Sequence, residues 1–129
     1  MTILDQINAN KRKEIEVAKK LVSISEMESS VLFDRKCPSL RESILKKSGI
    51  ISEFKRKSPS KGIINGEVSP ADVAFGYQNA GASAVSCLTD KDYFGGTFGD
   101  LKEARAAAER NAEPIGVQRK SHYPEKERW

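Results

Sequence analysis

The sequence predicts an α/β protein in which parallel strands alternate with helices, and three observations support this class. Residues 49–54, GIISEF, form a short apolar run typical of a buried strand. Residues 69–81 carry the signals that begin and end a helix. Residues 82–89, ASAVSCLT, form a second apolar run. The order strand, helix, strand predicts a right-handed crossover between two parallel strands.

Composition limits the classes of protein that fit. The chain has 129 residues, enough for one ordinary domain with its own core. It is 38% hydrophobic and 31% charged, which favours a soluble protein with long polar helices. The net charge of +4 suits an anionic small ligand, whereas basic residues that are not interleaved with aromatic ones argue against a nucleic-acid partner. No apolar run approaches the ~18 residues of a membrane span, and no signal-peptide core is present, so we expect a cytoplasmic protein without a membrane partner.

The two cysteines, Cys37 and Cys87, lie far apart in the sequence. They form neither a metal-binding pair nor a disulfide framework, which fits a reducing compartment. Cys87 falls in the second apolar run and is expected to be a small core residue. His122, the sole histidine, is expected to be solvent-exposed, and no metal site is expected.

Helices are predicted before the first strand. Residues 2–22 show helical periodicity, and capping-box patterns at Ser23 and Ser39 predict two further helices. The lysine groups of the first helix are expected to form a solvated face. The region 1–48 is therefore predicted to be a helical extension. The apolar stripe of its first helix consists of Leu4, Ile7, Ile15, Ala18 and Val22.

The predicted βα units occupy residues 49–110. Ser69 is the expected N-cap of the crossover helix, Pro70 its first residue and Gly81 its C-cap. Residues 90–99 are predicted to be a loop. The expected inward positions are Val73, Tyr77 and Ala80 in the crossover helix and Leu101, Ala104 and Ala108 in a helix over residues 100–110.

The last segment, residues 111–129, has a different character. Ile115 and Val117 are candidates for the start of a third strand, but Gly116 interrupts them. The polar stretch SHYPEKERW that follows has no apolar period. We therefore treat this segment as a divergent tail.

Glu53 and Lys55 form the first candidate site. They share one face of the first strand with Ile51, because side chains alternate along a strand. They lie near its C-terminal end, where parallel α/β folds keep their chemistry. The alternative is a solvated ion pair of purely structural origin, which spacing alone does not exclude.

Two loops add candidate ligand-binding groups. Residues 58–62, SPSKG, offer hydroxyls, a cation and a flexible glycine, which suit a phosphate, although such residues more often reflect solvent-facing turn chemistry. This loop is not a Walker loop, because the pattern GxxxxGK[ST] is absent. Tyr93 and Phe94 precede two glycines, a hinge-like pair, and either line a ligand pocket or pack under their own loop.

Residues 50–62, IISEFKRKSPSKG, and 80–96, AGASAVSCLTDKDYFGG, together closely resemble indole-3-glycerol phosphate synthase of tryptophan biosynthesis. The opening MTILDQINANKRKEI is similar to that family's N-terminal extension, and the resemblance runs from Met1 to about Ala107. It implies a TIM (β/α)8 barrel with added N-terminal helices. It also implies a lyase that converts 1-(2-carboxyphenylamino)-1-deoxyribulose 5-phosphate, an anionic small molecule, to indole-3-glycerol phosphate. This decarboxylase releases carbon dioxide and water and needs no cofactor.

The resemblance assigns roles to five residues. It implies that Glu53 and Lys55 are the catalytic pair of the first strand. The loop that contains Ser58 and Ser60 would close over the substrate, and Phe94 would line the anthranilate pocket.

Only part of such a barrel is expected in this sequence. A TIM barrel needs about 250 residues and eight strands, whereas two strands and part of a third are recognisable here. Lys120, in the sequence Arg119-Lys120-Ser121, is the candidate for the family's third-strand lysine, its main general acid. The residues after it depart from the family. We therefore expect a partial barrel from a truncated or frameshifted synthase, poorly stable and inactive alone.

Two other functions compete with this one. The chain is alternatively a non-catalytic phosphate-binding or self-assembling partial-barrel module that associates through exposed strand edges. A basic nucleic-acid-binding fragment is the third hypothesis, but nucleic-acid binding gives no reason for the SPSKG and YFGG motifs.

Overall fold

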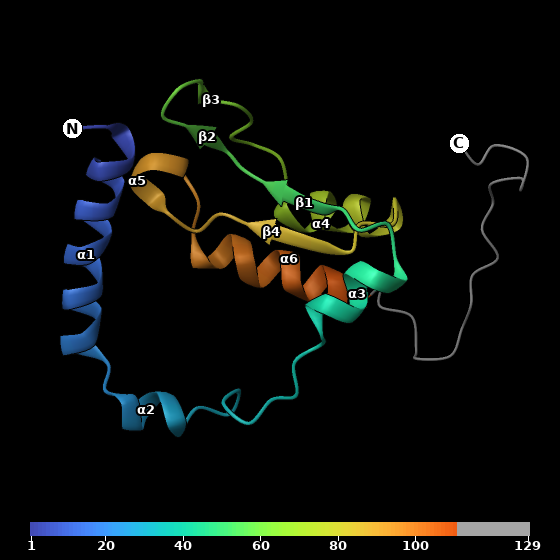
Figure 1. Ribbon diagram of the computed structural model, residues 1–129, viewed down its shortest axis with the longest axis horizontal. Helices are drawn as coiled ribbons and strands as arrows, with labels where there is room; N and C mark the ends of the chain where they lie inside the picture. The colour runs from blue at the N-terminus through green and yellow to red at the C-terminus, as the bar shows by residue number, and fades with distance from the viewer. Residues whose placement is uncertain (111–129) are drawn as a thin grey trace, which may run out of the picture.

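A computed structural model describes residues 1–110 of the chain. A two-stranded parallel sheet and its helices form a body, and an N-terminal helix stands beside it (Figure 1). The elements, in order, are α1 (Ile3–Leu21), α2 (Ile24–Glu28), α3 (Leu40–Lys46), β1 (Ile51–Phe54), β2 (Lys57–Ser58), β3 (Gly62–Ile63), α4 (Pro70–Asn79), β4 (Ala84–Cys87), α5 (Lys91–Phe94) and α6 (Phe98–Arg110).

The main sheet pairs β1 with β4 in parallel. Ile51 lies beside Ala84 and Phe54 beside Cys87 in this register. The parallel pairing predicted from the strand-helix-strand order is confirmed. A second, antiparallel pair, β2 and β3, was not predicted. Two-residue strands are too short to show alternation of polar and apolar residues, so this hairpin left no periodic signal.

The core lies on one face of the sheet. Helices α4 and α6 pack against each other and against the strands. Phe54 is only 4% exposed on this covered face, whereas Ile51 on the other face is 52% exposed. The expectation that both strands are buried is therefore wrong for one face: among residues 1–110, helices cover only the side that carries Phe54. The buried hydrophobic residues are Phe54, Ala74, Ala82, Ala104 and Ala107.

The crossover helix follows its sequence signals closely. The Ser69 hydroxyl accepts a hydrogen bond from the backbone N–H of Asp72 at 3.3 Å, and Pro70 is the first residue of α4. The C-cap is Ala80, and Gly81 follows it with φ +93°. A left-handed glycine at this position ends a helix without steric cost, and the observed C-cap lies one residue before the predicted one.

The inward side of helix α6 matches the expected one only in part. Ala104 is buried as predicted, but Ala107 is also buried and Leu101 is exposed. Small side chains face α4 here, so the two helices approach closely. The expected loop at residues 90–99 also contains the short helix α5 and the start of α6. Four residues are too few for helical periodicity to reveal α5.

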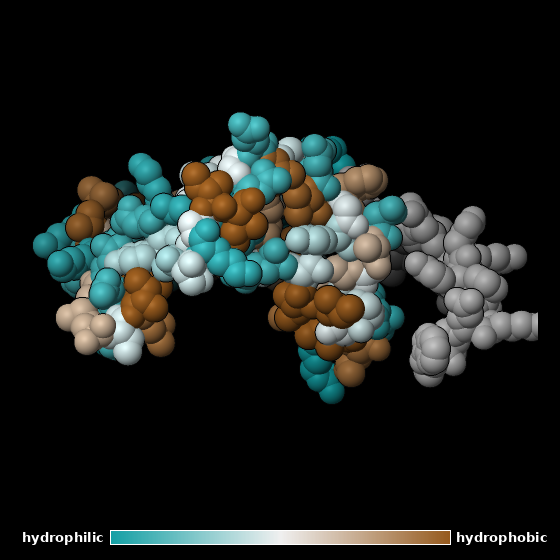
Figure 2. All heavy atoms as spheres, turned by 90° about the horizontal axis from the view of Figure 1, so that it is seen from above, coloured by the Kyte–Doolittle hydropathy of each residue, from teal (hydrophilic) through white to brown (hydrophobic). Residues whose placement is uncertain are grey.

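Residues 1–39, here called the N-terminal arm, carry α1 and α2. Both helices begin at capping boxes, on Thr2 and Ser23, which confirms the predicted helix starts. Neither helix has a buried residue, so the predicted apolar stripe of α1 is not enclosed by the described residues. Figure 2 shows hydrophobic residues, in brown, in separate patches on the visible surface.

Within the described part of the chain, no helix combines the length and apolar character that crossing a bilayer demands.

Both cysteines are free: Cys37 is exposed and Cys87 is half-buried, and burial raises the pKa of the Cys87 thiol. The candidate third strand, Lys120, His122 and the divergent tail lie outside the described residues.

Candidate active site

The parallel pairing of β1 and β4 brings their C-terminal ends to one edge of the sheet, where Glu53 and Lys55 form an ion pair. Lys55 Nζ lies 3.3 Å from Glu53 Oε1, and the side chains of Lys55 and Glu53 are 33% and 43% exposed. A pair with this much solvent access contributes little to stability. It lies on the side of the sheet that α4 and α6 leave open, so both charges remain accessible to a ligand.

The second oxygen of Glu53 has its own partner on the neighbouring strand. Ser86 is paired with Glu53 in the parallel register, and its hydroxyl donates to Glu53 Oε2 at 3.3 Å. The carboxylate is thus held between Lys55 and Ser86. Sequence reasoning missed Ser86, because only the register of the two strands places it beside Glu53.

Phe94 extends this cluster from the end of α5. Its ring centroid lies 5.9 Å from Lys55 Nζ, a distance at which an ammonium group and an aromatic face attract each other. The side chain is half-buried. Both expectations for this aromatic, a ligand wall and packing under its own loop, are compatible with a half-buried ring beside Lys55.

The two glycines after Phe94 allow close packing of the loop. Gly95 has φ +66°, and a Cβ there would lie 3.2 Å from Lys57 Cγ. A Cβ on Gly96 would lie 1.8 Å from the carbonyl oxygen of Leu88, and the Gly96 N–H donates to the Asp90 carbonyl at 2.8 Å. Gly96 is therefore a position of close backbone approach.

The SPSKG loop shows local turn contacts. The hydroxyl oxygens of Ser58 and Ser60 are 3.4 Å apart, and the backbone N–H of Lys61 donates to Ser58 Oγ at 3.2 Å. Ser58 is half-buried and Ser60 is exposed. These contacts fit the turn interpretation of the loop, and they leave the Ser60 side chain at the surface.

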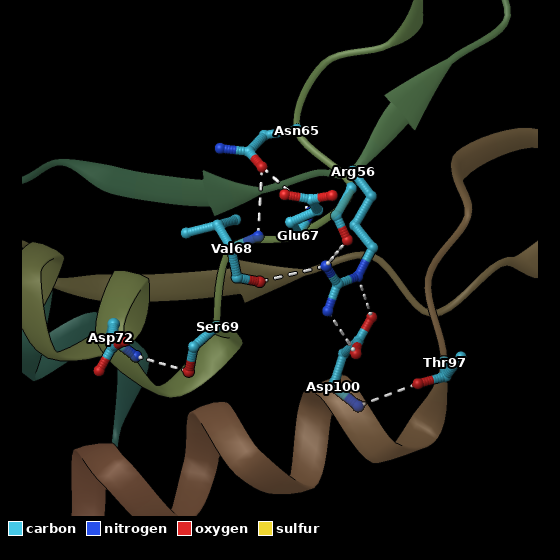
Figure 3. A network of polar contacts seen from close by, with 9 residues as sticks. Arg56, Asn65, Glu67, Val68, Ser69, Asp72, Thr97 and Asp100 are labelled. Carbon is cyan, nitrogen blue, oxygen red and sulfur yellow. Dashed lines mark hydrogen bonds and ion pairs between the residues drawn. The ribbon is translucent and has the colours of Figure 1, made fainter.

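Arg56, directly after the Glu53–Lys55 pair, anchors this end of the strand (Figure 3). Its Nε and Nη2 donate to the two carboxylate oxygens of Asp100, each at 3.0 Å. Its Nη1 donates to the carbonyl oxygens of Gly66 at 2.8 Å and Val68 at 3.1 Å. The guanidinium carbon lies 5.2 Å from the ring centroid of Phe54. One side chain therefore ties β1, the following loop and α6 together.

Sequence reasoning did not identify the Arg56–Asp100 pair, because 44 positions separate its members. The two side chains are 19% and 10% exposed. Hydrogen bonds from Arg56 hold the pKa of Asp100 below its ordinary value, although burial opposes this shift. The Asp100 N–H also donates to Thr97 Oγ1 at 3.0 Å, so the carboxylate sits in the capped first turn of α6.

The N-terminal arm reaches the site at the loop before Phe94. Lys11 Nζ lies 2.8 Å from Asp90 Oδ2, and Asn10 Nδ2 donates to Asp92 Oδ2 at 3.3 Å. A largely apolar cavity of about 640 Å³ lies between α1 and the ends of β4, α5 and α6. Residues of α1 thus form one wall of a space that Phe94 also lines.

The charges at this contact stabilise each other. Burial would raise the pKa of Asp90, but Lys11 and the backbone N–H groups of Tyr93 and Phe94 outweigh it and hold the pKa below its usual value. The close contact with Asp90, together with Glu14, raises the pKa of Lys11. Asp90 is therefore a carboxylate and Lys11 a cation at neutral pH.

Within residues 1–110, no group of three or more His, Cys, Asp or Glu side chains is placed to hold a metal ion. The chemistry that the cluster offers is a solvent-accessible cation, a carboxylate that orients it, and an aromatic ring beside both. Such a set has the chemistry to attract an anion that also carries an aromatic group.

Comparison with known proteins gives a family match over most of the chain. The family model for indole-3-glycerol phosphate synthase matches residues 4–117. The indole-3-glycerol phosphate synthase of Bacteroides thetaiotaomicron is 42% identical over 104 residues, which cover 80% of this chain and 40% of that protein. That of Polaromonas sp. is 43% identical over 110 residues, which cover 81% of this chain and 42% of that protein.

A match over fewer residues has a higher sequence identity. The indole-3-glycerol phosphate synthase of Desulfosudis oleivorans is 55% identical over 60 residues, which cover 46% of this chain and 23% of that protein. The chain therefore spans about two fifths or less of the length of these relatives.

Proposed function

Because the chain belongs to the indole-3-glycerol phosphate synthase family, we propose that it supplies the first two βα units of such a synthase. The reaction converts 1-(2-carboxyphenylamino)-1-deoxyribulose 5-phosphate to indole-3-glycerol phosphate, carbon dioxide and water. One observation carries the proposal: Lys55 lies between Glu53 and the ring of Phe94, at the C-terminal ends of the parallel strands.

The substrate chemistry matches these groups. The aryl carbon that bears the carboxylate attacks the ribulose carbonyl carbon, carbon dioxide leaves, and the carbonyl oxygen leaves as water. A cation or general acid at that oxygen makes the carbonyl electrophilic, and Lys55 would steer and hold the anionic substrate groups. Glu53, whose carboxylate lies 3.3 Å from Lys55 Nζ, would orient that ammonium group. Phe94 would flank the aryl ring of the substrate.

Two further parts belong to the proposal. The loop of Ser58 and Ser60 would close over the substrate. Lys120, outside the described residues, would take the place of the family's third-strand lysine.

The described residues contain two parallel strands, whereas a TIM barrel has about eight. We therefore expect turnover to require further βα units. We place the reaction in the cytoplasm, without a cofactor and without a nucleic-acid partner.

The test uses the chain and a chimera. The 129-residue chain is assayed for indole-3-glycerol phosphate formation by fluorescence, and we expect no turnover typical of an enzyme. Residues 1–107 are then joined to the part of the B. thetaiotaomicron synthase that follows the residue aligned with Ala107. We expect this chimera to be active and Lys55→Ala in it to lower kcat/KM about 100-fold or more. Lys102→Ala, on the exposed side of α6, is the matched control. Near-normal kinetics of Lys55→Ala would show that the assigned role is wrong.

A self-assembling module is the second candidate function, and the open sheet supports it. In the described residues each strand of the main sheet pairs with the other alone, and Ile51 is exposed on the uncovered face. Free strand edges and an apolar face favour association. Sedimentation velocity distinguishes the two: a discrete oligomer of the chain supports the module, and a monomer at all concentrations contradicts it.

A further inference from the structure

The N-terminal arm touches the proposed active site through a polar contact at Asp90. We propose that Lys11 is a positioning residue: by holding Asp90 it fixes α5, and therefore the ring of Phe94, over Lys55. The functional meaning of this inference rests on the proposed function, whereas its geometric part does not. The contacts run from Lys11 to Asp90, along α5 to Phe94, and from Phe94 to Lys55.

Asp90 links the two sides of this contact with its two oxygens. Its Oδ1 accepts the backbone N–H of Tyr93 at 2.8 Å and so caps α5. Its Oδ2 lies 2.8 Å from Lys11 Nζ, and the side chain is only 12% exposed. A helix of four residues has almost no stability of its own, so α5 depends on this cap. The orientation of one carboxylate therefore decides where Phe94 lies.

Acidic side chains from α1 itself and from the start of α5 surround Lys11. Glu14 and Asp90 both pair with Lys11, and Asn10 donates to Glu14 at 2.9 Å and to Asp92 at 3.3 Å. Lys11 thus lies between the carboxylates of Glu14 and Asp90, and Asn10 links Glu14 to Asp92. Removing the cation leaves the Glu14 and Asp90 carboxylates facing each other, and we expect their repulsion to weaken the contact between α1 and α5.

The cavity beside this contact shows which residues would be affected if the Lys11–Asp90 pair were lost. Ile7 and Ile15 of α1 line it together with Phe94 and Phe98. No residue of α1 is buried, so apolar packing alone holds the helix weakly. If the Lys11–Asp90 pair is lost, we expect α1 to move and Phe94 to lose its fixed place beside Lys55.

The experiment measures the Lys55 side chain in the full 129-residue chain by NMR with ¹³C-labelled lysine. Lys55→Arg assigns its methylene signals, and Phe94→Leu gives the shift that the aromatic ring causes. We expect Lys11→Gln to shift the Lys55 signals in the same direction as Phe94→Leu and by most of that amount. Lys11→Arg should restore the wild-type positions. Lys13→Gln, on the same helix and exposed, should leave them unchanged.

Unchanged Lys55 signals in folded Lys11→Gln would overturn the proposal, and so would an equal shift in Lys13→Gln. If circular dichroism shows that Lys11→Gln is unfolded, Asp90→Asn carries the test. Asparagine keeps the cap of α5 and removes the charge that Lys11 holds. We expect a smaller shift of the Lys55 signals in the same direction, and no shift would overturn the proposal.

The functional arm uses the chimera. A residue that positions an aromatic wall acts mainly on substrate binding, so Lys11→Gln should raise KM several-fold with a smaller change in kcat, and Lys11→Arg should restore KM. A change in kcat alone would contradict this role. If the chimera is inactive but the NMR shift is present, the proposed function fails while the positioning of Phe94 by Lys11 stands.

Discussion

The chain has two parts, the N-terminal arm and the body, by which we mean residues 40–110. Helix α1 of the arm and helix α6 of the body differ in what stabilises them. Helix α6 buries Ala104 and Ala107 against the rest of the body, and Asp100 in its first turn binds Arg56 from β1. Helix α1 buries nothing; it begins at a capping box on Thr2 and carries ion pairs between residues three positions apart. Helix α6 is therefore ordered by buried long-range contacts, whereas α1 relies on local contacts and on the polar contacts of Lys11 with Asp90 and of Asn10 with Asp92.

The contrast indicates where a substitution will be felt. All buried hydrophobic residues among residues 1–110 lie in the body, so damage there should change the unfolding of the whole core. Damage in the arm should change local helix content or the contact at Asp90. Substitutions on both sides of this division test it.

The largest effect is expected from Gly96→Ala. A Cβ at this position would lie 1.8 Å from the Leu88 carbonyl oxygen and 2.7 Å from its carbon, both backbone atoms that cannot rotate away. The end of β4 or the loop must therefore shift, which costs about 3 kcal/mol of unfolding free energy. Urea unfolding followed by circular dichroism measures the loss.

Gly76→Ala is the matched control for that substitution. Gly76 lies inside α4, has no positive φ, and offers open space for a Cβ, with no neighbouring atom of another element within 4 Å of it. Alanine has the higher helix propensity, so this variant should gain about 0.5–1 kcal/mol. If both glycine variants destabilise equally, the close approach at Gly96 is not the cause.

The second effect concerns the Arg56–Asp100 pair. Lysine cannot reproduce the two parallel hydrogen bonds to Asp100 together with those to the Gly66 and Val68 carbonyls. Arg56→Lys should therefore lower the unfolding free energy by about 2 kcal/mol. Arg105→Lys, in an exposed pair on α6, should cause no measurable change in the same urea titration. Equal effects of the two variants would place Arg56 among ordinary surface residues.

A smaller effect is expected in the pH dependence of stability. The pKa of Asp100 is lower in the folded chain than its ordinary value of about 4. Its stabilising contribution is therefore complete above that ordinary value and is lost as pH falls through the lowered pKa. Asp100→Asn should be less stable than wild type at neutral pH, and the difference should shrink in acid. A difference independent of pH would show that the charge of Asp100 does not matter.

The contrast between local and long-range contacts also explains how much of the fold was predictable from sequence. The helices that begin at Ser23, Ser39 and Ser69 have local signals within four residues, and each was found. Parallel pairing of the two strands follows from their order along the chain. The inward side of α6 was misjudged at Leu101, because only the position of α4 decides which residues face it.

The candidate site shows the same limit. Glu53 and Lys55 were predictable because alternation along one strand places them on one face. Ser86, Arg56 and the Lys11–Asp90 contact were not, since each depends on a strand register or on helices far apart in the chain. Phe94 was named as a candidate ligand-pocket residue, but its place beside Lys55 needed the structure.

The smallest effect on the body is expected from Ser23→Ala in the arm. The Ser23 hydroxyl accepts the Glu26 N–H at 3.2 Å, and the Glu26 carboxylate accepts the Ser23 N–H at 2.7 Å, so the substitution removes half of the capping box of α2. It should cost about 1 kcal/mol of local helix stability. Amide hydrogen exchange should therefore become faster in α2, while the urea midpoint of the body stays unchanged, because α2 buries no residue. A lowered midpoint would show that arm and body unfold as one unit, and Lys11 at Asp90 would then be the first contact to examine as their link.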